Sequence, residues 1–195
     1  MDAPIRLTLS DGAVVEVAVI RSRRKTMQLE LHSGQFRVRA PLRTSDARLR
    51  AFLQAHEPWI RSMAAKAEEQ RRQAGEVMTP EELEALKKKA REVIPPRVRY
   101  YADRLGVSYG TVTIRCQSSR WGSCTSKGNL NFNCLLLLAP TAVLDSVVIH
   151  ELCHRKHMNH SAAFYRDLLA VCPDYREQTA WLNEHGPALL MRAGK

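Results

Sequence analysis

The spacing of apolar positions changes along the chain, and these changes predict its elements. The first forty residues contain four short runs rich in Val, Ile, Leu and Thr, which partly alternate with polar residues, at 5–9, 13–20, 26–31 and 35–40. Such runs predict strands, and the sequences SDG and HSG between them are turn signals. An antiparallel meander is the simplest arrangement for these strands.

Helical spacing replaces alternation after Ser45, which is a plausible N-cap. From there to about Arg72 the apolar positions recur at Leu49, Phe52, Leu53, Ile60 and Met63. Pro58 is expected to break or restart this helix, because proline removes a backbone donor.

A second long helix is predicted after the connector GEVM. Thr79 can cap it, Pro80 suits its first position, and Glu82 completes a capping box. The two prolines at 95–96 should kink or interrupt the helix before Gly106 ends it.

The remainder of the chain mixes strands and helices. The segments 111–116 and 130–138 look like strands on either side of a polar loop, QSSRWGSCTSKGN. Pro140 leads into a helix that carries histidines, Ser161 can cap the next helix, and a last helix follows Pro173 to about residue 184. We therefore expect two domains: 1–78, a β-rich N-terminal subdomain plus linking helix, and 79–195, the domain that carries the histidines.

Charge and composition narrow the class of protein. The 195 residues carry a net charge of +10, and the segment 21–50 holds nine Arg and Lys against two acids. Such a basic region could attract nucleic acid or other anions, but no nucleic-acid-binding motif accompanies it, which favours a solvated face. The longest apolar run, Leu135 to Ala139, is far too short for a bilayer, so no membrane partner is expected.

The compartment is predicted from the N-terminus and the cysteines. The N-terminal sequence lacks the basic start and apolar core of a signal peptide, which indicates a cytoplasmic protein. The five cysteines form no CxxC pair. They are expected to be free thiols in a reducing compartment.

The segment HELCHRKHMNH, residues 150–160, contains four of the seven histidines. In its H-E-x-x-H motif, His150 and His154 lie one turn apart on the same face of a helix, so two imidazoles can bind one metal ion. Glu151 points to the side, where it can accept a proton from a water beside the metal. A bare H-E-x-x-H occurs by chance, but the extra histidines and the apolar flanks favour a metal site.

A catalytic zinc usually has a third protein ligand, and His157 and His160 compete for this role. On a continuing helix, His157 would lie about 10 Å along the axis from His150, too far for a compact site. His160 reaches the metal only if the chain folds back after the helix, and the spacing HExxHxxxxxH matches the zincin pattern with such a reversal. We therefore assign His160 as the third ligand.

Two C-terminal segments, RWGSCTSKGNLNFN and LDSVVIHELCHRKHMNHSAAFY, resemble the YgjP-like metallohydrolase family, which is related to the SprT-like and WLM zinc peptidases. IRSRRKTMQLEL, VRAPLRTS and FLQAHEPWI resemble the N-terminal half of that family, so the resemblance covers nearly the whole chain. It implies an α+β fold, with a zincin-like metallopeptidase core, a small antiparallel β-rich N-terminal subdomain and linking helices. It also implies metal ligands at His150, His154 and His160 and a catalytic glutamate at Glu151.

The loop before the second C-terminal strand offers one further candidate. Arg120 could stabilise negative charge on a substrate oxygen or bind a phosphate, or it could form a structural salt bridge. For Trp121 and Gly122 the structural interpretation is favoured, because lone tryptophans usually pack in a core.

Three functions remain open at this stage. The leading hypothesis is a zinc metallopeptidase that binds one Zn²⁺, or another divalent transition metal, and acts on a peptide or protein. The second is a nucleoside triphosphate pyrophosphohydrolase on the same site, since a bacterial relative is associated with hydrolysis of UTP to UMP and pyrophosphate. The third is a non-catalytic nucleic-acid-binding module, against which an intact Glu151 argues.

Overall fold

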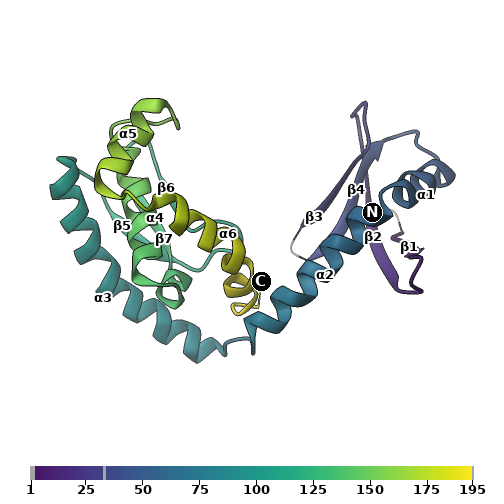
Figure 1. Cartoon of the computed structure of the whole chain (residues 1–195), viewed down its shortest axis with the longest axis horizontal. Coiled ribbons are helices and arrows are strands. Elements are labelled where there is room, and N and C mark those ends of the chain that lie inside the picture. The colour runs from purple at the N-terminus through teal and green to yellow at the C-terminus, as the bar shows by residue number, and fades with distance from the viewer. Residues whose placement is uncertain (1–2, 33, 195) are drawn as a thin grey trace. The chain divides into compact units, whose positions relative to one another are not determined.

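The computed structural model describes residues 3–32 and 34–194, and its helices and strands form an α+β protein, as expected (Figure 1). The chain divides into two compact units, Met1–Arg72 and Gln73–Lys195, and each is described by itself. The domain boundary expected from the sequence lies a few residues further on. Within the described ranges, no helix is both long enough and apolar enough to cross a membrane.

The first unit contains a four-stranded sheet and two helices. Its elements are β1 (Ile5–Thr8), β2 (Val14–Ser22), β3 (Gln28–His32), β4 (Gln35–Pro41), α1 (Asp46–Ala55) and α2 (Glu57–Ala74), which runs to the boundary. The strand order is β1-β2-β4-β3. Two neighbouring pairs are antiparallel, but β2 pairs with β4 in parallel. The expected meander was therefore wrong.

Burial explains why β2 and β4 pair directly. Val17 and Val19 of β2 lie in register with Phe36 and Val38 of β4, and all four side chains are buried. Leu31 of β3 is only half-buried, which suits an edge strand. A meander would have placed β3 between these two apolar strands. The segment 23–27 instead crosses the end of β4 to reach β3.

The helices of the first unit begin and end where the sequence predicts. Ser45 caps α1 by accepting a hydrogen bond from the Arg48 backbone. α1 ends at His56, and Pro58 lies in the first turn of α2, where its missing N–H costs nothing. Leu49 and Leu53 of α1 and Ile60 of α2 are fully buried and pack with the apolar residues of the sheet in one core.

Both acidic residues of the basic segment 21–50 form ion pairs within this unit. Arg21 pairs with Asp46 at 2.6 Å, and Arg39 pairs with Glu30 at 2.9 Å. Two arginines of the basic segment are therefore engaged in ion pairs within the first unit.

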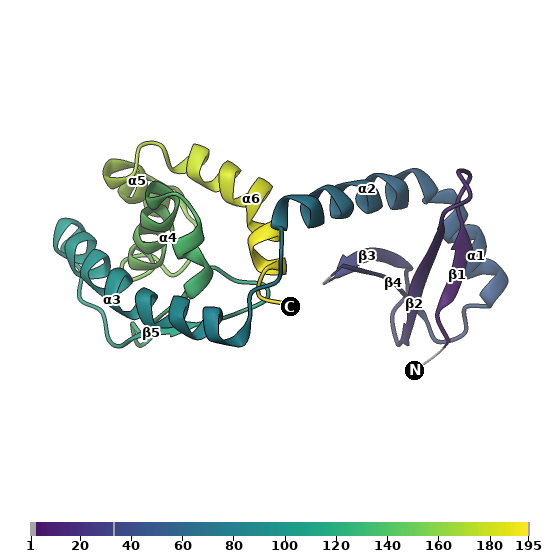
Figure 2. The same ribbon diagram turned by 90° about the horizontal axis from the view of Figure 1, so that it is seen from below.

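The second unit packs a small sheet against four long helices. Its elements are α3 (Pro80–Leu105), β5 (Val112–Arg115), β6 (Gly122–Cys124), β7 (Leu130–Asn133), the 3₁₀ helix η1 (Cys134–Leu138), α4 (Thr141–Cys153), α5 (Ala162–Val171) and α6 (Tyr175–Met191). The strand order is β5-β7-β6, with β5 parallel and β6 antiparallel to β7. α4 lies at the centre, and α3, α5 and α6 pack around it (Figures 1 and 2).

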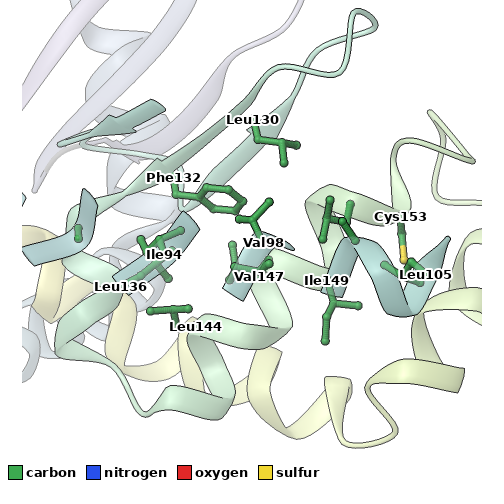
Figure 3. Packing of buried hydrophobic residues seen from close by; sticks show 14 of the residues in the cluster. Ile94, Val98, Leu105, Leu130, Phe132, Leu136, Leu144, Val147, Ile149 and Cys153 are labelled. Carbon is green, nitrogen blue, oxygen red and sulfur yellow. The ribbon is translucent and has the colours of Figure 1, made fainter. Parts of the chain in front are cut away.

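The predicted start and end of α3 are confirmed, but its interruption was wrong. Thr79 and Glu82 form the capping box, and Gly106 ends the helix in the left-handed conformation at φ 62°. The helix continues through the prolines at 95–96 because Ile94 and Val98, on either side of them, are fully buried in the core (Figure 3). This packing offsets the lost backbone hydrogen bonds.

Two strand predictions in the second unit also needed correction. The strand expected at 130–138 ends at Asn133, because the Asn133 Oδ1 accepts the backbone N–H of Leu135 and starts η1. The polar loop contains a strand that the sequence did not reveal, β6. The last helix, α6, extends beyond residue 184 to Met191, and its Gly186 and Ala188 are buried.

Candidate metal centre and cleft

The structure brings three histidines together at the end of the central helix. His150 lies in the last turn of α4, His154 directly follows it, and His160 precedes α5 after the chain has turned back. The Nε2 atom of His150 lies 3.2 Å from that of His154 and 3.2 Å from that of His160. All three ligand atoms lie within 4.8 Å of one another, so the group could hold a metal ion.

The donor set fits a zinc ion. Two nitrogens at about 2.0–2.1 Å from a tetrahedral zinc lie about 3.3 Å apart, close to the spacing of the Nε2 atoms. Three imidazoles also leave the fourth position of a tetrahedron to water or substrate, as in catalytic zinc sites.

Two hydrogen bonds orient the rings. The Nδ1 of His154 lies 3.0 Å from the carbonyl oxygen of His157, which can only accept a hydrogen bond. The Nδ1 of His150 lies 2.8 Å from the hydroxyl of Tyr175, the first residue of α6. When Nδ1 is the donor in both bonds, the Nε2 lone pairs of His150 and His154 are directed at the shared centre, which is the usual arrangement around metal-binding histidines.

Phe164 forms an apolar floor against the three rings. Its ring centroid lies 5.1 Å from that of His150 and 4.9 Å from those of His154 and His160. Phe164 is fully buried, and its backbone N–H is held by the side chain of Ser161, the predicted N-cap of α5. The cap therefore fixes the floor of the site as well as the helix.

Burial keeps His150 and His154 neutral at neutral pH. Burial, and then the neighbouring His154 and His160, lower the pKa of His150 to about 4. Burial also lowers the pKa of His154. A neutral imidazole is the form that binds a metal, so protons compete little with a metal at neutral pH.

Glu151 lies buried beside this group. Its residue is 6% exposed, and burial raises the pKa of its carboxyl group to about 7. Gly122 of β6 lies against it, and a Cβ at position 122 would be 2.6 Å from the Glu151 Oε1 and 2.7 Å from its Cγ. Gly122, for which packing alone was expected, therefore makes room for Glu151.

An open cleft of about 280 Å³ lies between α4 and β6. Its wall residues are Gly122, Ser123 and Cys124 from β6, and His150, Glu151 and His154 from the α4 side, with Arg120 and Met158 alongside. The structure thus brings Arg120 to the same cleft as Glu151 and two of the histidines.

Asn133 supports the segment that carries Arg120. Its side chain is fully buried, and its Nδ2 donates to the carbonyl of Gln117 at 2.8 Å and to that of Arg120 at 3.0 Å. Trp121 packs against Gly186 of α6, where a Cβ would lie 3.0 Å from the indole ring, in agreement with the packing role expected for it.

His157 lies outside the group of three. Its Nε2 is 3.0 Å from the Asp167 Oδ2 on α5, so its ring pairs with that carboxylate. Only its backbone carbonyl contacts a member of the group, His154.

Sequence reasoning missed Phe164, Tyr175 and the contact of Gly122. For Phe164 a signal existed, since its position three residues after Ser161 follows from the cap. Tyr175 lies 25 residues after His150 in the sequence. No sequence pattern near His150 or Tyr175 predicts that these two side chains come into contact.

Comparison with known proteins places these residues in a family context. The model of the family described as YgjP-like, metallopeptidase domain, matches residues 25–84 and 81–185. Among solved structures, the metallopeptidase zymogen abylysin of Pyrococcus abyssi is 21% identical, with a TM-score of 0.43 over 47% of this chain and 94% of its own. The zymogen jannalysin of Methanocaldococcus jannaschii is 18% identical, with a TM-score of 0.40 over 45% of this chain and 94% of its own. No curated protein matched the chain.

Proposed function

The chain belongs to the YgjP-like metallopeptidase family, and we propose that it is a zinc peptidase whose metal is held by His150, His154 and His160. The family makes it a metal-dependent hydrolase of the metallopeptidase type. The three imidazoles support zinc among the divalent metals, because imidazole and tetrahedral geometry suit this ion. When bound, zinc would polarise the scissile carbonyl and lower the pKa of a water in the cleft.

We assign Glu151 as the general base. Its side chain lines the same cleft as His150 and His154, but its carboxylate is not part of the group of three ligand atoms, so we assign it to the water and not to the metal. Burial raises the pKa of its carboxyl group above the ordinary range, which suits a group that accepts a proton from water and returns it to the leaving amine. The low polarity that raises this pKa also strengthens electrostatic interactions in the cleft.

The single observation that carries a peptide substrate is the position of β6. The strand pairs with β7 on one side only, and its three residues form the cleft wall opposite Glu151 and the histidines. An extended peptide could pair with the other edge of β6, so that its scissile bond passes over the metal centre. A nucleotide would gain nothing from such an edge.

We assign Arg120 to the substrate. Its side chain is exposed and lies along the cleft, where a guanidinium could bind a carbonyl or carboxylate oxygen of the peptide. Among the described residues that line the cleft, Arg120 is the one Lys or Arg. A triphosphate would need several cations, so this lining favours the peptidase over the pyrophosphohydrolase.

The cellular setting belongs to the same proposal. All five cysteines are free thiols, which suits a reducing compartment such as the cytoplasm.

The basic N-terminal unit could bind nucleic acid in addition, and a steep salt dependence of DNA or RNA binding would support this.

The test is a substrate screen with zinc-loaded protein. Mixed peptides and nucleoside triphosphates are offered side by side to wild type, to Glu151→Gln and to a control, Glu184→Gln, whose carboxylate is exposed on α6. We expect peptide cleavage that falls about 10² to 10⁴-fold in Glu151→Gln, with zinc content unchanged, and stays at wild-type level in the control. Hydrolysis of triphosphates that depends on Glu151, without peptide cleavage, would overturn the peptidase assignment.

A further inference from the structure

A second pocket, of about 410 Å³, lies between α5 and α6. Its walls are largely apolar: Tyr165 and Leu169 of α5 face Tyr175 and Ala180 of α6 across it. Its volume falls in the usual range of about 300–1,000 Å³ for small-molecule sites. We call it the α5/α6 pocket.

The α5/α6 pocket shares two walls with the surroundings of the metal centre. The Tyr175 hydroxyl lies 2.8 Å from the Nδ1 of His150, and the two rings are nearly parallel, with centroids 5.9 Å apart. The Tyr165 ring centroid lies 6.3 Å from that of His160. Through these two tyrosines the pocket lies next to His150 and His160 on the side of α5 and α6, whereas the cleft is lined by His150 and His154 on the side of β6.

Three polar side chains, those of Arg176, Thr179 and Asn183, complete the lining. Arg176 and Asn183 are both exposed at the pocket. Within the described part of the chain, neither side chain makes a hydrogen bond, and Arg176 has no acidic partner. An apolar pocket with one available guanidinium is complementary to a ligand that carries an apolar group next to a carboxylate.

We propose that the α5/α6 pocket binds a bulky apolar side chain of the peptide substrate, close to the scissile bond, and that Arg176 binds a neighbouring carboxylate of the same peptide. This inference rests on the proposed peptidase function, because it names a substrate class for that site. The carboxylate can come from the C-terminus of the peptide or from an acidic side chain, since both offer the same group.

Binding of blocked amino acids tests the pocket without catalysis. Acetyl-phenylalanine, acetyl-leucine and acetyl-alanine, each as free acid and as amide, are titrated into zinc-loaded protein while the methyl NMR signals of Leu169 and Ala180 are followed. We expect Phe and Leu to bind about 10- to 100-fold more tightly than Ala, because a hydrophobic pocket discriminates by size. The free acids should bind about tenfold more tightly than the amides.

Variants assign this binding to named residues. Ala180→Trp should fill the pocket and abolish binding, whereas Ala170→Trp, at an exposed position of α5 that does not line the pocket, should leave it unchanged. Arg176→Ala should remove the preference for free acids and retain the preference for Phe and Leu. Acetyl-phenylalanyl-glutamate α-amide, whose only carboxylate is a side chain, distinguishes the two sources of the carboxylate.

The outcomes separate the pocket from the peptidase. Equal binding of Ala and Phe probes, or binding that survives Ala180→Trp, would overturn the pocket. If the probes bind as expected but no peptide is cleaved by wild type, the pocket stands and the proposed function fails. If peptides are cleaved, Ala180→Trp should lower kcat/KM for Leu- and Phe-containing peptides about tenfold or more relative to Ala-containing ones, and the Ala170→Trp control should not.

Discussion

Gly122 and Glu151 fit together so closely that the glycine admits no side chain. A Cβ at position 122 would lie 2.6 Å from the Glu151 Oε1, 2.7 Å from its Cγ and 2.9 Å from its Cδ. The backbone of β6 therefore lies directly against the carboxylate that we propose as the general base. The same short strand supplies the edge that we propose for the substrate, so one glycine aligns the substrate edge with the base.

Gly122→Ala should lower activity without removing the metal. The added methyl group must push the Glu151 side chain or β6 aside, and a misplacement of about 1 Å can cost about 10²-fold in rate. We expect kcat to fall by about that factor while zinc content, measured by mass spectrometry, stays near one ion per chain. Wild-type kcat in this variant would show that Glu151 does not need its present position.

The third ligand can be identified from metal content. His160→Ala should lose zinc, because the Nε2 of His160 lies 3.2 Å from that of His150 in the shared group. His157→Ala should retain zinc, because the His157 ring pairs with Asp167 instead. Dialysis against a weak chelator followed by elemental analysis compares the two variants, and the reverse pattern would refute the assignment.

Tyr175→Phe should weaken metal binding. The change deletes the hydroxyl that lies 2.8 Å from the Nδ1 of His150, and loss of such a partner typically costs about 10- to 100-fold in metal affinity. Competition with a chromophoric chelator measures the affinity. Tyr165→Phe is the matched control, because Tyr165 touches His160 through its ring and not through its hydroxyl. Equal affinities in both variants would mean that the hydroxyl does not support His150.

The metal-free protein should show a pH dependence that Glu151→Gln changes. Burial raises the pKa of Glu151 from 4.5 to about 7, so the folded state holds a proton that the unfolded chain releases. The ionisation of Glu151 therefore lowers the free energy of unfolding, by up to about 3 kcal/mol, as the pH rises from about 4.5 to about 7. His150 acts in the opposite direction, since its pKa is lowered from 6.5 to about 4 and its contribution to stability grows over that range.

Comparing wild type with Glu151→Gln isolates the contribution of Glu151 to the free energy of unfolding. From about pH 4.5 to about pH 8, Glu151→Gln should gain about 3 kcal/mol relative to wild type, because the amide does not ionise while His150 is common to both. Urea unfolding in the presence of EDTA gives both free energies. Parallel pH profiles for the two proteins would show that Glu151 ionises freely in the folded state.

The predictions that succeeded depend on residues close together in the sequence. Ser45, Thr79 and Ser161 cap their helices because each side chain bonds a backbone N–H three residues on. The convergence of His150 and His154 follows from one helical turn. The position of His160 was predicted from the HExxHxxxxxH spacing, which matches a pattern with a chain reversal after the helix.

The features that the sequence did not predict depend on distant contacts. β6 is three residues long, and its pairing with β7 defines it more than its own composition does. The run at 130–138 has the composition of one strand, yet only its first four residues form β7. Its last five form the 3₁₀ helix η1, which starts where the Asn133 Oδ1 accepts the backbone N–H of Leu135. β2 and β4 are neighbours because their buried apolar residues lie side by side in the sheet. This pairing depends on the three-dimensional fold and cannot be read from either strand alone.

Both sheets contain the same arrangement of three consecutive strands, and it sets an order of folding. In the first sheet, β3 and β4 form a local antiparallel pair, and β2 pairs in parallel with the other edge of β4. In the second sheet, β6 and β7 form the local antiparallel pair, and β5 pairs in parallel with the other edge of β7. Local hairpins form within about 1–10 μs, whereas pairing of distant strands is slower. We expect β6 and β7 to pair early and β5 to dock later. Only then does the segment 116–121, which crosses the end of β7, acquire its final path. Arg120 would therefore reach the cleft among the last steps of folding, and its backbone amide should exchange with solvent before those of β7.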